Sequence, residues 1–161
     1  MKRLVSLGGV LALLIILGIW WFSPPQVLKR RTQSLLSTLT MDAGAGRASR
    51  AMATYSLNNL LAPQVELNTP TIPEANGLFE RQELESAFTW LANQAKQTRF
   101  DLKKIHSVTV NDDLGKVKLT LVGLVELPNY RPADGSYEVS FDWNKGEDGW
   151  RLTRADWTLV P

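Results

Sequence analysis

Three titratable side chains in the second half of the chain are candidates for acid–base chemistry. His106 shares the alternation of Val108 and Val110, which predicts that it lies on the apolar side of a strand. General acid–base catalysis needs such a group in a pocket, beside a carboxylate that tunes its pKa. Asp101 and Asp142 are the carboxylates that could fill this role. The alternative, which we favour, is a structural histidine with a backbone partner, because Asp142 falls on the polar side of its own strand.

Aromatic residues form a second candidate site, an apolar ligand pocket. The candidates are Tyr55, Phe88, Tyr137, Phe141, Trp143, Trp150 and Trp157. Residues of this kind more often fill a core, and that is the interpretation we prefer.

The composition excludes several classes of site. The chain has no cysteine and a single histidine, so a disulfide, a thiolate nucleophile and a conventional zinc site are ruled out. No glycine-rich phosphate loop and no nucleophile elbow is recognisable. The formal net charge of +2 does not indicate a nucleic-acid partner. We therefore expect no metal and no cofactor, and we expect a protein that is not an enzyme, although the sequence leaves that point open.

The N-terminal segment predicts a membrane anchor. Residues 4–22 contain no charge, and at 1.5 Å per residue a helix of this length spans about 28 Å. Trp20, Trp21 and Phe22 end the segment, as expected of an interfacial aromatic belt. The sequence thus predicts a cytosolic N-terminus over residues 1–3, a transmembrane helix over residues 4–22 and one domain over residues 23–161.

A cleaved signal peptide is the alternative, but the residues before Ser23 are bulky, whereas cleavage sites have small ones. Lys2 and Arg3 precede the segment, which favours a cytosolic N-terminus and a domain outside the cytoplasmic membrane, in the periplasm or outside the cell. Residues 23–41 form a basic stem. Its residues Lys29, Arg30 and Arg31 are expected to contact the membrane surface, with lipid as the partner.

The period of the apolar residues changes once along the rest of the chain. Helical spacing predicts helices over residues 24–41, 47–61 and 80–94, with a short strand over 64–67 and a loop over 68–77. After residue 100 the apolar residues alternate, which predicts a four-strand antiparallel meander with a bulge near Thr153 and Arg154. The outer face of this sheet is polar and includes Lys118 and Glu138. Helices followed by strands indicate an α+β fold with helices on one face of the sheet.

Three stretches resemble the NTF2-like superfamily, which includes SnoaL-like and cystatin-like proteins. They are the helix Glu80 to Gln94, the strand Ser136 to Trp143 and the hairpin that ends Asp148-Gly149-Trp150-Arg151-Leu152. The resemblance implies a cone of about three helices packed on a curved, mostly antiparallel sheet. The layout of an anchor followed by such a domain is also similar to the VirB8-type subunits of secretion machines.

The function that we expect is a membrane-tethered, non-enzymatic binding or assembly module, such as a subunit of an envelope complex. Its partner would be another protein or a second copy of the chain, bound through the sheet. The alternative is a small-molecule-binding or isomerase/dehydratase-like pocket, of the kind that some soluble relatives have. A deep cavity containing His106 and a carboxylate would favour this alternative, whereas a cavity filled by aromatic residues would favour the assembly module.

Overall fold

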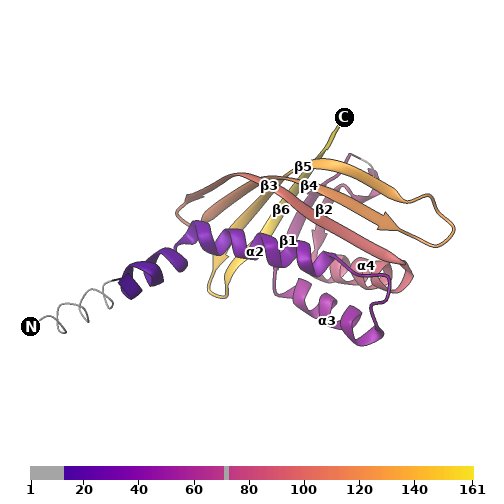
Figure 1. Cartoon of the computed structure of the whole chain (residues 1–161), viewed down its shortest axis with the longest axis horizontal. Coiled ribbons are helices and arrows are strands. Elements are labelled where there is room, and N and C mark those ends of the chain that lie inside the picture. The colour runs from indigo at the N-terminus through magenta and orange to yellow at the C-terminus, as the bar shows by residue number, and fades with distance from the viewer. Residues whose placement is uncertain (1–12, 71–72) are drawn as a thin grey trace, which may run out of the picture.

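The computed structural model describes residues 13–70 and 73–161, in which a single curved sheet is flanked by helices (Figure 1). The strands are β1 (Leu61–Asn68), β2 (Gly77–Glu80), β3 (Gln97–Asn111), β4 (Leu114–Glu126), β5 (Ala133–Gly146) and β6 (Gly149–Val160). Their order across the sheet is β2-β1-β6-β5-β4-β3. All neighbouring strands are antiparallel except β1 and β6, which are parallel. The predicted α+β class and four-strand meander are confirmed.

Three α-helices lie on one side of this sheet (Figure 1). They are α2 (Pro24–Leu39), α3 (Arg47–Asn58) and α4 (Arg81–Gln94), and a short 3-10 turn, η1, covers Pro73–Ala75. All three predicted helices are present. The second is shorter than predicted, because Leu60 already accepts a strand-type hydrogen bond from the Leu152 N–H at 2.8 Å. The strand β2 was not predicted.

The chain before α2 is helical over residues 13–21. In the described part of the chain no helix combines the length and the apolarity needed to cross a bilayer. Residues 4–12 of the predicted transmembrane helix lie outside the described residues.

The helix ends follow from their local sequence. Ser23 is the N-cap residue of α2 and Pro24 occupies its first turn, where the missing N–H costs nothing. Helix α4 begins with a capping box, in which Glu80 caps the first turn and its own N–H donates to the Glu83 carboxylate at 2.8 Å. The inward face of α4 then carries Phe88 and Ala92, both buried.

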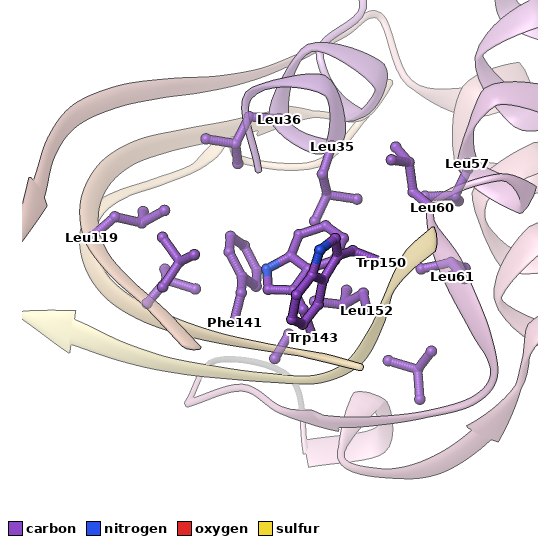
Figure 2. Packing of buried hydrophobic residues seen from close by; sticks show 14 of the residues in the cluster. Leu35, Leu36, Leu57, Leu60, Leu61, Leu119, Phe141, Trp143, Trp150 and Leu152 are labelled. Carbon is purple, nitrogen blue, oxygen red and sulfur yellow. The ribbon is translucent and has the colours of Figure 1, made fainter. Parts of the chain in front are cut away.

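The hydrophobic core fills the concave side of the sheet. In Figure 2 the strands curve around Leu119, Phe141 and Trp143, while Leu35 and Leu36 of α2 close the core from the other side. The two layers approach closely at Gly115 of β4. A Cβ placed there would overlap the Leu28 side chain and lie 3.1 Å from the Trp150 ring. The absence of a side chain at Gly115 therefore lets α2 rest directly on the sheet.

Bulges give the sheet its curvature. The pairing of β3 with β4 shifts between Leu102 and Lys104 and again between Ile105 and Ser107. The pairing of β5 with β6 shifts at Thr153, as predicted. Because each bulge adds one residue and increases the local twist, these three positions bend the sheet around the core.

Candidate functional site

His106 lies on the outer face of the sheet, so its predicted inward orientation is wrong. The two bulges in β3 reverse the side-chain alternation twice, and Ile105 takes the inward position between Leu102 and Val108. His106 is exposed, and its Nε2 atom forms a hydrogen bond with the Thr120 hydroxyl at 2.7 Å. The apolar spacing of Val108 did not reveal this position, because the two bulges in β3 lie so close together that only Ile105 marks the inward side between them.

Neither candidate carboxylate is the partner of His106. Asp142 lies on the outer face of β5 and forms an ion pair with Lys116 at 3.1 Å. Asp101 is paired with Arg99 at 3.4 Å, two residues away on the same strand. The structure therefore does not bring His106, Asp101 and Asp142 together as the acid–base group considered from the sequence.

The aromatic candidates are divided between the core and the surface. Phe88, Phe141 and Trp143 are 5%, 1% and 1% exposed and belong to the hydrophobic core. Trp157 packs against that core, and its ring contacts Phe100, Tyr137 and Phe141 edge to face at centroid distances of 5.7–6.1 Å. These residues fill the concave side with side chains, which is the arrangement expected of a structural core.

Tyr55, predicted to face inward, is 73% exposed. Leu57 is the residue of α3 that packs into the core. Helix α3 lies beside α4, where Thr54 and Asn58 bond to Thr89 and Glu85, so its tyrosine is left on the solvent side. The inward prediction was wrong because Tyr55 and Leu57 are two positions apart, about 200° around a helix, so the orientation that buries Leu57 exposes Tyr55.

A shallow hollow of about 290 Å³ lies on the outer face of the sheet, over strands β3 to β6. Its lining includes His106, Lys118, Glu138, Ser140, Asp156 and Thr158. Lys118 and Glu138 are exposed, and neither forms an ion pair with any described residue. The buried Ser140 hydroxyl also has no hydrogen-bond partner among these residues. Among the described residues, the lining of the hollow thus contains one unpaired cation, one unpaired anion and one hydroxyl without a hydrogen-bond partner, on neighbouring strands.

The charges beside this hollow neutralise one another. Arg154 contacts Asp156 at 2.9 Å and Glu66 at 3.2 Å, and the Asn68 amide donates to Asp156 at 2.7 Å. The hydrogen bond with Asp156, aided by the nearby carboxylates, raises the pKa of Arg154. Because these groups are already paired, Lys118 and Glu138 are the charges at the hollow that remain free for a partner.

A second hollow, of about 250 Å³, lies between α2 and α3. Hydroxyl groups of Ser37, Thr38, Thr40, Ser49 and Ser56 line much of it. Asp42 is the titratable residue in this lining, so the hollow offers no acid–base pair.

The basic residues of the stem point in different directions. Arg31 turns into the fold, donates to the Asn59 carbonyl at 3.2 Å and lies beside Arg151, which donates to the Asn58 carbonyl at 3.0 Å. Burial, followed by repulsion from Arg151, lowers the pKa of Arg31. Arg30 instead reaches back toward the N-terminal helical segment, and Lys29 is half-buried. The three residues therefore do not form one continuous basic surface.

No protein-family model and no curated protein sequence matches the chain. Solved structures do match. An NTF2-like superfamily protein from Salmonella enterica serovar Typhimurium aligns with a TM-score of 0.66 over 85% of this chain and 91% of its own, at 11% identity. The chain has an NTF2-like fold.

Two further structures of this fold differ in their described roles. The CaMKII hub of S. rosetta aligns with a TM-score of 0.62 over 86% of this chain and 98% of its own, at 16% identity. A proposed dehydratase of the NTF2-like family from Streptomyces avermitilis aligns with a TM-score of 0.61 over 83% of this chain and 94% of its own, at 15% identity. At such identities the likeness establishes the fold, and the site itself must carry any argument about activity.

Proposed function

We propose that the protein is a membrane-tethered, non-enzymatic assembly module that pairs with a second copy of itself through the outer face of its sheet. This proposal rests on the difference between the two faces of the sheet. The concave side is filled by Phe88, Phe141 and Trp143, whereas no described helix covers the outer face (Figure 1). A filled cone favours an assembly module over a ligand or dehydratase pocket, which needs open space.

The free charges on the outer face suit a two-fold interface. Lys118 lies on β4 opposite Ser140, and Glu138 lies on the adjacent strand β5 opposite Thr120, so the two charges are two positions apart along the ladder. In a two-fold dimer the same patch meets itself. An axis that passes between these two residues would place each Lys118 opposite the Glu138 of the second copy. The name of the S. rosetta neighbour, a hub, is consistent with assembly through this fold.

The membrane tether is supported by the residues before α2. Leu13, Ile16 and Phe22 are 59%, 64% and 75% exposed, and the side chains between them are similarly uncovered. A helix that is apolar on all sides is stable only in an apolar surrounding, and no described part of the chain supplies one. Lipid is the surrounding that suits it, so we place the domain on a membrane, outside the cytoplasm, as the flanking Lys2 and Arg3 favour.

Charge reversal tests the proposed interface. The full-length tagged protein is purified in mild detergent, and its mass is measured by native mass spectrometry. We expect a dimer, and we expect Lys118→Glu and Glu138→Lys each to weaken pairing by more than about tenfold, because like charges then face each other. Arg131→Glu, an equal reversal in the β4–β5 loop, is the matched control and leaves the dimer intact.

A mixing experiment makes the test specific. Mixing Lys118→Glu protein with Glu138→Lys protein makes both contacts complementary again, so hetero-pairs form where neither variant pairs alone. Single variants that remain dimeric, or a mixture that stays monomeric, contradict the proposed interface. A stoichiometric foreign protein in place of the second copy contradicts self-pairing as well. Recovery of the protein from the soluble fraction after cell breakage contradicts the tether.

A further inference from the structure

The junction between the N-terminal helical segment and α2 has a defined geometry. Ser23 ends the first segment, and its hydroxyl donates to the Trp20 carbonyl at 2.7 Å. The Phe22 N–H still bonds to the Gly18 carbonyl at 3.0 Å, so the turn follows directly after the helical part. Pro24 then starts α2. The two helical pieces are therefore joined by a short elbow.

Arg30 is anchored at this elbow by two contacts with one residue. Its Nη1 atom donates to the Trp21 carbonyl at 2.8 Å. Its guanidinium carbon lies 4.6 Å from the centroid of the Trp21 ring, within the range of a cation–π contact. Both contacts hold the guanidinium of α2 over the end of the preceding segment, and they fix its plane.

These contacts leave most of the binding capacity of Arg30 unused. A guanidinium carries five N–H donors, and the structure records one hydrogen bond from Arg30. No carboxylate of a described residue is paired with Arg30 or with its neighbour Lys29. By contrast, Arg31 is turned into the fold. At the elbow, Arg30 is therefore a fixed positive charge with no carboxylate partner among the described residues, and Lys29 is a second positive charge next to it in the sequence.

The residues next to Arg30 are of the kind that lie at the level of lipid phosphates. Trp21, which contacts Arg30, is 52% exposed, and its chain neighbours Trp20 and Phe22 are 54% and 75% exposed. Exposed tryptophans at the end of an apolar segment sit at the headgroup level of a bilayer. The planar fork of an arginine matches the oxygens of a phosphate and binds two of them at once.

We propose that Arg30, held by Trp21 and assisted by Lys29, binds the phosphate of an anionic phospholipid headgroup. The inference rests on the proposed tether, and it adds a specific lipid site at the elbow. Because Arg30 belongs to α2, which packs on the sheet, a lipid bound there also fixes the angle of the domain to the membrane.

Lipid retention tests this site. The full-length protein in detergent is mixed with dioctanoyl phosphatidylglycerol or dioctanoyl phosphatidylcholine, and bound lipid is counted by native mass spectrometry. We expect a preference of about fivefold for the anionic lipid, as one uncompensated charge provides. Arg30→Gln abolishes this preference. Arg30→Lys keeps the charge but loses the planar fork, so this variant retains only part of the preference. Arg131→Gln removes an equal charge far from the elbow, and this control variant retains the full preference for the anionic lipid.

Several outcomes overturn the site. Equal retention of the two lipids, or an undiminished preference in Arg30→Gln, contradicts it. Millimolar inorganic phosphate that displaces the anionic lipid identifies a free-phosphate site instead. Membrane sedimentation and dimer mass are measured on the same samples. If both are normal while the lipid preference is absent, the lipid site fails and the proposed function stands. If wild-type protein is soluble, the tether itself fails.

Discussion

Two threonines with the same burial differ in whether their hydroxyl groups have partners. Thr98 is 1% exposed, accepts from the Met41 N–H at 3.1 Å and donates to the Leu39 carbonyl at 2.6 Å. Thr32 is 0% exposed, and its hydroxyl has no partner among the described residues. The first hydroxyl joins the end of α2 to β3, while the second is buried with no compensating bond.

Opposite effects are therefore expected from the same substitution. Thr98→Val leaves the Leu39 carbonyl and the Met41 N–H with one partner fewer, and it should lower the free energy of unfolding by about 1–3 kcal/mol. Thr32→Val replaces an unsatisfied hydroxyl by a methyl group, so the free energy of unfolding should stay equal or rise. Urea unfolding followed by tryptophan fluorescence measures both. A destabilisation of equal size at the two sites would contradict the assigned hydrogen bonds.

At the scale of elements, the contact of α2 with the sheet depends on a residue without a side chain. Gly115→Ala would place a methyl group against Leu28 and Trp150, both of which are buried. We expect the free energy of unfolding to fall by about 1–3 kcal/mol, as in other overpacked cores. Gly44→Ala is the matched control, because nothing lies within 4 Å of the added atom. A control that falls as much as Gly115→Ala would show that loss of glycine alone is responsible.

Long periodic elements were predictable from the sequence, whereas a very short strand and two closely spaced bulges were not. The helix Arg81–Gln94 and strand β5 carry strong 3.6-residue and two-residue patterns, so their type was clear. Strand β2 has four residues and follows a proline-rich loop, so it offers too few positions for any pattern. It forms because β1 provides an edge on which it pairs.

The candidate site was predicted less well, for a related reason. The polar outer face, with Lys118 and Glu138, follows from simple alternation on two regular strands. His106 sits at a bulge, where alternation fails. The fixed position of Arg30 on Trp21 depends on the angle at the elbow, which residue types alone do not specify.

At the scale of the whole molecule, the proposed tether predicts a topology for the domain. With Lys2 and Arg3 retained in the cytosol, a reporter enzyme that works only outside the cytoplasm should be active when fused after Pro161. The C-terminus follows β6 and projects from the sheet, so the fusion has room (Figure 1). A reporter that works only in the cytosol should be inactive at the same place, and the reverse pair of results would invert the topology.

The bulged strand β3 has a consequence for how copies behave when they are crowded. It is the long edge of the sheet, with 15 residues, and an edge of this kind invites strand-to-strand aggregation. Its two bulges break the regular spacing of the free N–H and C=O groups, and exposed Lys103 and Lys104 add charge. The opposite edge, β2, is only four residues long. If the proposed tether holds the molecules in the plane of a membrane, they collide often. Two edges that disfavour strand pairing would then keep the molecules apart at a density at which a regular edge would start fibres.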